Sequence, residues 1–237
     1  MTLATDDPLA VEVTAAIHSG DTRALAALLR DHAELASARI GDESCSRTLL
    51  HVLTDWPGHR PNGAEAVRAL VDAGADVNAR FVGRHTETPL HWAASCDDVE
   101  VLDALLDRGA HIEAEGAVIA GGTPLLDATA FGQWNAAHRL VERGAETRLW
   151  PAATLGLLDR VEAELVARPP TREEVTEAFW GACHGGQLGT AERLLAERAD
   201  INWVGWDGLT PLDAASREGA EDVVAWLRSI GGVSAPS

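Results

Sequence analysis

Cysteine, histidine and carboxylate side chains are the groups in this sequence that could act as nucleophile, base or acid. The most suggestive arrangement is Cys183-His184-Gly185-Gly186, where a thiol and an imidazole are adjacent. Adjacent side chains on a helix point about 100° apart, so this pair is not aligned as a nucleophile and its base. No GxGxxG or GxxxxGKS/T motif occurs, so the two glycines predict a turn between helices and no nucleotide site.

The other potential metal ligands are scattered along the chain. Cys45, Cys96 and Cys183 show no CxxC spacing, and His51 and His91 are too far apart for the i, i+4 pairing of a zinc-binding helix. Three isolated cysteines also provide no disulfide framework. We therefore expect neither a metal nor a cofactor.

The charge of the chain restricts its partners. Acidic residues outnumber basic ones 37 to 19, for a formal net charge of -18. Such a field repels phosphate, so nucleic acids and anionic membranes are poor partners, although an acidic surface can also serve solubility alone. The N-terminus lacks a basic region, and no apolar run approaches the ~18 residues of a membrane span. We therefore expect a cytoplasmic protein, and a monomer.

Recurring motifs indicate that the chain is built from a repeat. A Thr-Pro-Leu triplet, or a weaker Thr-Leu-Leu version of it, begins at four places: Thr48, Thr88, Thr123 and Thr210. A Gly-Ala or Ala-Asp pair recurs in phase with these triplets, at Gly74, Gly109, Gly144 and Ala199. Triplets in phase with such pairs are much stronger evidence for a repeat than one isolated match.

This pattern resembles the ankyrin repeat. The family's TPLHxA element is present as Thr88-Pro89-Leu90-His91-Trp92-Ala93, and its GADVNA element as Gly74-Ala75-Asp76-Val77-Asn78-Ala79. The resemblance covers nearly the whole chain. It implies an all-α fold, an ankyrin-repeat α-solenoid of about six to seven helix-turn-helix repeats with short hairpin fingers. We expect one domain over residues 1–232 and a flexible tail over residues 233–237.

The physical chemistry of helices agrees with this resemblance. Proline suits the first turn of a helix, where its missing N–H costs nothing, and Thr88 can cap the helix start. The small side chains of Ala93 and Ala94 allow the next helix to approach closely. Gly109 follows an apolar Leu-Leu pair and can end the second helix of its repeat in a left-handed conformation.

The threonine position gives a register for the repeats, which we expect to begin at Val11, Thr48, Thr88, Thr123, Thr147, Glu177 and Thr210. The second repeat carries extra residues over 56–63, between its two helices. The fifth follows the fourth too closely for a hairpin finger. In regular repeats the resemblance implies that His51 and His91 tie the helix start to neighbouring backbone. Trp150 and Trp180 replace this histidine, and we expect each indole N–H to bond a backbone carbonyl.

The resemblance also implies a binding function. In ankyrin proteins the positions after the Ala-Ala pair and at the hairpin tips face a concave groove, where partners usually bind. We therefore predict a binding module for a protein segment or other ligand, lined by Asp55, Trp56, Glu87, Ser95, Cys96, Asp127, Phe131, Trp180, His184, Trp206 and Asp207. Aromatic anchors with few charges suit recognition. Trp56, Phe131 and His184 occupy equivalent, partner-facing positions.

A small-molecule pocket, or an atypical enzyme with acid–base chemistry, is the alternative. The irregular central repeats could curl the groove into a pocket around Asp55, Trp56, Glu87, Asp127, Trp180 and His184. A histidine beside carboxylates in an apolar pocket can transfer protons. Convergence of these residues on one closed cavity would favour this alternative, and an open groove would favour the binding module.

Overall fold

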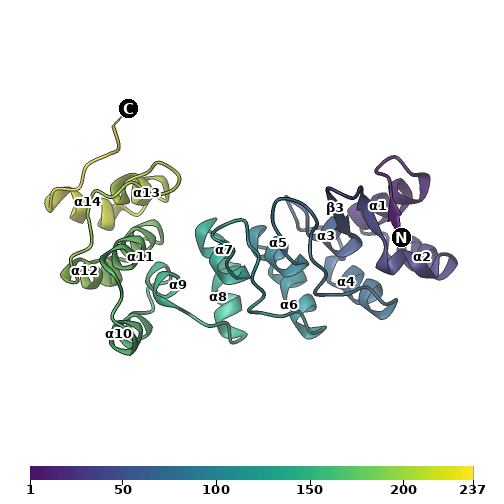
Figure 1. Cartoon of the computed structure of the whole chain (residues 1–237), viewed down its shortest axis with the longest axis horizontal. Coiled ribbons are helices and arrows are strands. Elements are labelled where there is room, and N and C mark those ends of the chain that lie inside the picture. The colour runs from purple at the N-terminus through teal and green to yellow at the C-terminus, as the bar shows by residue number, and fades with distance from the viewer. Residues whose placement is uncertain (237) are drawn as a thin grey trace. The chain divides into compact units, whose positions relative to one another are not determined.

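The computed structural model describes residues 1–236, which form two compact units, Met1–Ala145 and Glu146–Ser237. Each unit is described here by itself. Across the described residues the regular structure is mainly helical and forms seven successive pairs of antiparallel helices (Figure 1). The predicted all-α ankyrin-repeat solenoid is therefore confirmed. The single domain expected over residues 1–232 stays a prediction.

The first unit, which we call unit 1, contains four helix pairs and a small N-terminal sheet. Its elements are β1 (Thr2–Leu3), α1 (Pro8–Ser19), α2 (Thr22–Asp31), a 3-10 helix (Ala33–Ser37), β2 (Arg39–Gly41), β3 (Ser46–Thr48), α3 (Leu49–Thr54), α4 (Gly63–Asp72), α5 (Pro89–Ser95), α6 (Val99–Asp107), α7 (Pro124–Ala130) and α8 (Trp134–Glu142). The inner helices α3, α5 and α7 pack side by side, and so do the outer helices α4, α6 and α8.

The second unit, unit 2, contains the last three helix pairs. Its elements are α9 (Leu149–Thr154), α10 (Leu158–Ala167), α11 (Arg172–His184), α12 (Leu188–Ala196), α13 (Pro211–Arg217) and α14 (Glu221–Ser229). Inner helix α11 packs against both α9 and α13. The core of this unit is centred on Phe179, which is fully buried.

Threonine and histidine together start the regular inner helices. In α5 the Thr88 N–H donates to His91 Nδ1 at 3.1 Å, and the Thr88 hydroxyl lies 2.9 Å from the same nitrogen. The accepting Nδ1 leaves the proton on Nε2, which donates to the Gly122 carbonyl at 3.2 Å. His51 makes the equivalent bond to the Glu87 carbonyl at 3.1 Å. Each histidine therefore ties its inner helix to the hairpin finger that follows.

Burial keeps both histidines neutral. It lowers the pKa of His51 to about 3 and that of His91 to about 4. Neither imidazole can act as a general acid at neutral pH, and both ring nitrogens are engaged in hydrogen bonds of the fold. The structural role predicted for His51 and His91 agrees with these contacts.

A three-stranded sheet at the N-terminus was not expected from the sequence. Strand β1 pairs with β2 in parallel, and β2 pairs with β3 antiparallel. Arg39 reinforces the sheet, because its Nη2 donates to the Ser46 carbonyl at 2.9 Å. Strands of two or three residues are too short to produce a readable alternation of apolar and polar residues.

The missing finger before the fifth repeat is confirmed, and a second one is missing before α11. Only residues 168–171 connect α10 to α11. Helix α11 begins at Arg172, capped by Thr171 and Glu174, so the start expected at Glu177 is too late. The capping box Thr171-Arg172-Glu173-Glu174 explains the longer helix, because it satisfies the exposed N–H groups one turn earlier.

Whether the indole N–H of Trp150 or Trp180 finds an acceptor depends on these fingers. Trp180 Nε1 donates to the Leu209 carbonyl of the following finger at 2.9 Å, as expected. Trp150 Nε1 is buried and has no acceptor within residues 1–236, so the same expectation is wrong for Trp150. The reason is local: the finger that would follow Trp150 is absent, and its carbonyl with it.

The last helix and the tail close unit 2. Trp226 in α14 is half-buried, and its ring lies 6.2 Å from that of Phe179. The Val233 N–H donates to Asn202 Oδ1 at 2.9 Å, and the Ala235 N–H to Asp213 Oδ2 at 2.8 Å. Ser237, the end of the predicted flexible tail, lies outside the described residues.

Membrane insertion finds no support in the helices. None of those in residues 1–236 is both long and apolar enough to cross a bilayer. The cytoplasmic location and the monomeric state stay predictions.

We expect Ala94→Leu to lower the free energy of unfolding by about 1–3 kcal/mol, because it overpacks a close contact between inner helices. Ala94 is completely buried in α5. Ala225→Leu, at an exposed position of α14, is the control and should change stability little. Urea unfolding measures both. Equal stability of the two variants would show that α5 does not pack tightly through this alanine.

Candidate functional site

The predicted surface residues of unit 1 divide into exposed aromatics and smaller, half-buried groups. Trp56 is 79% exposed and Phe131 is 47% exposed. Ser95 Oγ donates to the His91 carbonyl at 2.9 Å, and Cys96 Sγ lies 3.6 Å from the Thr54 carbonyl. Asp55 pairs with Arg47. The two aromatics are thus available to a partner, whereas the small side chains mainly serve the fold.

Cys96 and Cys183 are not poised for nucleophilic chemistry. Burial, followed by the charges of Asp98 and Asp55, raises the pKa of Cys96 to about 11. Burial also raises the pKa of Cys183, which is completely enclosed in α11. A thiol rather than a thiolate is therefore present at neutral pH, and the thiolate is the reactive form.

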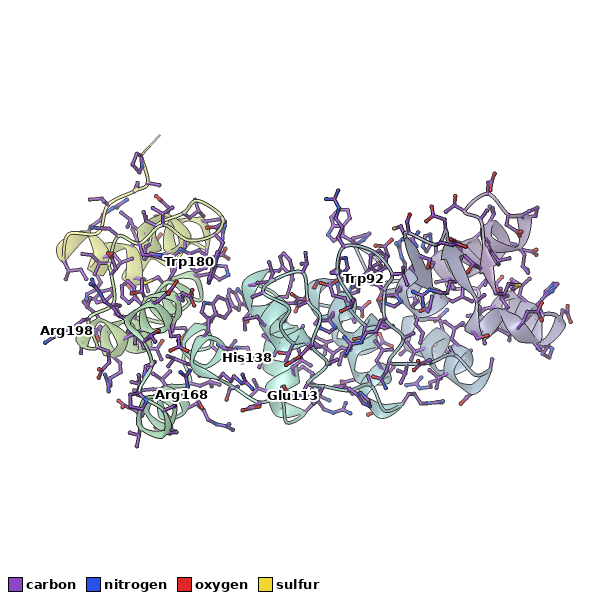
Figure 2. The ribbon with its side chains drawn as sticks, viewed as in Figure 1. Trp92, Glu113, His138, Arg168, Trp180 and Arg198 are labelled. Atoms are coloured by element: carbon purple, nitrogen blue, oxygen red, sulfur yellow. The ribbon has the colours of Figure 1, made fainter. Side chains whose placement is uncertain are left out.

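Glu87 organises the finger side of α5. Its Oε2 accepts from Trp92 Nε1 at 2.7 Å, and its Oε1 accepts from the Val118 N–H at 2.6 Å. His85 Nδ1 lies 3.1 Å from Oε2. Since Val118 belongs to the next finger, one buried carboxylate joins two neighbouring fingers to α5, on the side where Figure 2 labels Trp92.

Asp127 of α7 lies beside Glu87 and is completely buried. Neither of its carboxylate oxygens has a hydrogen-bond partner among the described residues. Burial, followed by the negative charge of neighbouring Glu87, raises the pKa of Asp127 to about 8. Asp127 is therefore mainly neutral at pH 7, and in that form it can donate a proton toward Glu87.

Four predicted residues of unit 2 lie close together. The rings of Trp180 and His184 are 5.3 Å apart, and Arg217 Nη2 lies 3.3 Å from His184 Nδ1. The same guanidinium donates to Asp207 Oδ2 at 2.8 Å. Asp207 in turn neighbours Trp206 on the finger between α12 and α13. Figure 2 labels Trp180 on this side of the unit.

His184 is not a surface residue. Only 1% of it is exposed, so the partner-facing position predicted for it is wrong. Trp180, one turn earlier on α11, covers one face of the ring, and Arg217 from α13 reaches its Nδ1. The contact with His184 Nδ1 therefore helps to hold the Arg217 guanidinium in position.

Trp206 is the most exposed aromatic residue of unit 2, at 67%. Its ring lies 5.3 Å from that of Trp203 in an edge-to-face arrangement, and the exposed Val204 lies between them in sequence. The finger itself is fixed: the Gly205 N–H donates to the Leu209 carbonyl at 2.8 Å. A side chain at Gly205 would clash, because its Cβ would lie 2.9 Å from Trp180 Nε1.

The residues proposed for acid–base chemistry do not form one group within either unit. In unit 1, Asp55 and Trp56 belong to the surface, whereas Glu87 and Asp127 are buried. Trp180 and His184 in unit 2 are buried as well. No group of three or more histidine, cysteine, aspartate or glutamate residues in residues 1–236 has the arrangement to hold a metal ion.

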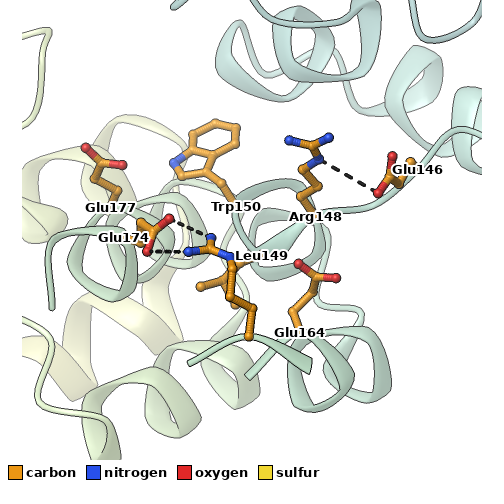
Figure 3. Close-up of a pocket in the computed structure, with 8 residues that line it drawn as sticks. Glu146, Arg148, Leu149, Trp150, Glu164, Glu174 and Glu177 are labelled. Atoms are coloured by element: carbon orange, nitrogen blue, oxygen red, sulfur yellow. Dashed lines mark hydrogen bonds and ion pairs between the residues drawn. The ribbon is translucent and has the colours of Figure 1, made fainter. Parts of the chain in front are cut away.

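Unit 2 also contains a hollow that the sequence analysis did not identify (Figure 3). It has a volume of about 340 Å³ and lies at the starts of α9 and α11, lined by Glu146, Arg148, Leu149, Trp150, Glu164, Arg168, Glu174 and Glu177. The short connections before α9 and α11 leave this region uncovered. The early return of the fifth repeat was the sequence signal, but the lining comes from three helices.

Comparison with known proteins identifies repeats of one kind. A family model described as ankyrin repeats (3 copies) matches residues 13–116. An ankyrin repeat and KH domain-containing protein of Caenorhabditis briggsae is 30% identical to this chain over 121 residues. That match covers 45% of this chain and 5% of the relative, so the chain spans only a small part of the relative's length.

We expect Asp127→Asn to stabilise the protein increasingly as the pH rises from about 4 to 8. The folded state holds the Asp127 proton up to about pH 8, whereas the unfolded state releases it near the ordinary aspartate pKa of 3.8. The wild-type protein therefore loses stability through this window, by at most about 1.4 kcal/mol per pH unit. Asparagine imitates the protonated form and removes the dependence.

Thermal melts from pH 4 to pH 9 measure this difference. Asp31→Asn, at the exposed end of α2, makes the same charge change and is the control. Parallel stability curves for wild type and Asp127→Asn would contradict the assignment of a buried neutral carboxyl group.

Proposed function

We propose that the chain binds a segment of another protein, because residues 13–116 match ankyrin repeats, which are generally protein–protein interaction modules. The binding site in this proposal is the finger surface of unit 2, defined by Val204, Trp206, Asp207, Arg217 and Glu218. The exposure of Trp206 on a rigid finger is the observation that carries the proposal.

The finger surface has the composition of a binding hot spot. Tryptophan and arginine are the residues most enriched among interface anchors. Trp206 remains exposed although Trp203 packs against its ring. Large exposed apolar side chains in a folded protein are costly to keep unless a partner covers them, and adjacent Val204 extends the apolar patch.

Rigidity supports the same conclusion. The Leu209 carbonyl accepts hydrogen bonds from both the Gly205 N–H and Trp180 Nε1, so the finger is tied to the core of α11. An anchor that is already held in place loses little conformational entropy when a partner binds. The arrangement favours recognition of an extended segment that lies across the finger and α13.

Charges beside the anchor provide selectivity. Arg217 donates to Asp207 at 2.8 Å and to Glu218 Oε1 at 3.0 Å, and His184 lies under the guanidinium. These groups are partly exposed, so a partner with polar groups in the wrong places would leave one of them desolvated and unpaired. We assign them to specificity and Trp206 to affinity.

Unit 1 contributes anchors of the same kind. Trp56 and Phe131 occupy equivalent positions in the second and fourth repeats, and both are exposed. Their spacing along the stack suits a partner that contacts several repeats. In this proposal Trp56 and Phe131 form a secondary contact region of unit 1.

A peptide selection on the intact chain tests the proposal. We expect peptides from a random display library to bind the wild-type protein and to lose on the order of tenfold or more in affinity for Trp206→Ala. Val166→Ala is the matched control, because Val166 is a highly exposed apolar residue on α10, away from the finger. Fluorescence anisotropy with the selected peptides measures the affinities.

Thermal melts of both variants show whether the fold is retained. Equal loss of affinity in Trp206→Ala and Val166→Ala, or no loss in either, would exclude the finger surface as the binding site. Binding that depends on Trp56 and not on Trp206 would move the site to unit 1.

A further inference from the structure

The hollow of unit 2 carries a charge that its own side chains do not neutralise. Four carboxylates and two guanidinium groups line it. Arg168 is paired with Glu174 at 2.6 Å, and Arg148 lies 3.8 Å from Glu146. Glu164 interacts with Arg168 only through longer-range electrostatic attraction. Neither Glu164 nor Glu177 forms a hydrogen bond or close ion pair with another side chain in the described part of the chain. The hollow therefore has room for a further positive charge.

Burial and neighbouring charges show how unfavourable this arrangement is for one carboxylate. Burial, then the negative charges of Glu173 and Glu174, raise the pKa of Glu177 above its ordinary value. A cation placed beside Glu177 would relieve this cost, because an opposite charge favours the ionised form.

An indole forms the wall between these carboxylates. Trp150 lies above Glu174 in Figure 3, with Glu177 on one side and Arg148 on the other. Gly181 allows the indole to pack closely against α11, since a Cβ at this position would lie 3.0 Å from the Trp150 ring. The face of a tryptophan attracts cations, and arginine most often, through its quadrupole.

The hollow already binds one guanidinium from within the chain. Arg168 is 70% exposed, yet its Nη2 and Nη1 lie 2.6 Å and 3.3 Å from the two oxygens of Glu174. This is the two-point contact that a planar guanidinium makes with a carboxylate and that a lysine cannot reproduce. About 340 Å³ stays open with Arg168 in place, which is near the lower limit for a small-ligand site and suits one long side chain.

We propose that this hollow receives an arginine side chain from the bound protein segment, with its guanidinium against Trp150 and between Glu164 and Glu177. The inference rests on the proposed binding of a protein segment and names the chemistry of that segment. The chain's net charge of -18 attracts a basic partner over a distance. The hollow then binds one of the partner's positive charges. The charge of Arg168, which already interacts with Glu164, competes with the incoming guanidinium for that carboxylate and so limits the affinity.

The sites fit one extended partner because they belong to neighbouring elements of unit 2. The hollow lies at the starts of α9 and α11, and the finger surface lies before and along α13, which packs against α11. The absence of the fingers before α9 and α11 opens the hollow, while the finger before α13 carries Trp206. A segment with an apolar residue and an arginine would use both.

The test is a titration of the intact, ¹⁵N-labelled protein with a capped Gly-Arg-Gly-Arg-Gly peptide, followed through the Trp150 indole N–H resonance. Trp150→Phe identifies that resonance. We expect a saturable shift with the arginine peptide and none with the same peptide carrying citrulline, which has the shape of arginine without its charge.

Paired variants separate the hollow from the general acidity of the chain. Glu164→Gln and Glu177→Gln should each weaken binding by about threefold, the effect of one exposed ion pair, while Arg168→Ala should tighten it by about the same factor. Glu221→Gln and Arg228→Ala make the same charge changes at exposed positions of α14 and should alter the affinity much less. Melting temperatures show that each variant is folded.

Several results would overturn the inference. They are an unshifted Trp150 resonance, equal shifts with arginine and citrulline, or equal effects of the hollow and α14 variants. The last would show that only the net charge attracts the peptide. Loss of selected-peptide binding in Trp206→Ala with no effect of Arg168→Ala would leave the finger surface standing and reject the guanidinium site. If the arginine peptide still binds and Trp206→Ala keeps its affinity for the selected peptides, the guanidinium site stands and the finger surface is rejected.

Discussion

One hydrogen bond fixes the geometry of the repeats: the bond from the ring N–H of the residue in the histidine position of an inner helix to a carbonyl of the finger that follows. His51 donates to Glu87, His91 to Gly122 and Trp180 to Leu209. In each case a buried ring N–H meets an otherwise unsatisfied carbonyl, so breaking the bond would leave two buried polar groups without partners. Because the bond spans two repeats, it sets the position of a finger relative to the helix before it.

The same constraint explains where binding features occur. With the bond in place, the finger before α13 is rigid and presents Trp206. Without the finger, Trp150 keeps an unsatisfied N–H and the starts of α9 and α11 lie open. Unit 2 thus has an exposed anchor where a finger is present and an open hollow where the fingers are absent.

The sequence predicts the parts of this fold that depend on local chemistry. Thr88, Pro89 and His91 start α5 as expected, because capping and the proline requirement act within one turn. The seven helix pairs and the acceptor of Trp180 follow from the same register. By contrast, α11 begins a full turn or more before Glu177, because a capping box at Thr171 outweighs the register of the repeat.

Contacts between repeats are the part that the sequence cannot provide. His184 occupies a position that is exposed in a regular repeat, but the bulky Trp180 beside it and Arg217 from α13 enclose it. Asp127 occupies the helix position that Trp92 has in the preceding repeat, and nothing in its neighbours along the chain announces a neutral carboxyl group beside Glu87. Both outcomes depend on which side chain from another repeat fills the adjoining space.

The arginines on the acidic surface pair with carboxylates at defined places. On the outer helices, arginines link neighbouring repeats through carboxylates: Arg139 and Arg143 contact Asp103, and Arg193 contacts Glu162. Each such exposed pair adds little stability by itself, but together they reduce the repulsion that a net charge of -18 imposes on a folded chain. Glu164 and Glu177 lie outside this pattern, since neither forms a close ion pair within the described residues, and in our proposal an arginine of the partner supplies the missing charge. Long-range attraction by the whole surface would set how fast a basic segment arrives, and Trp206, which contributes desolvated contact area, would set how slowly it leaves.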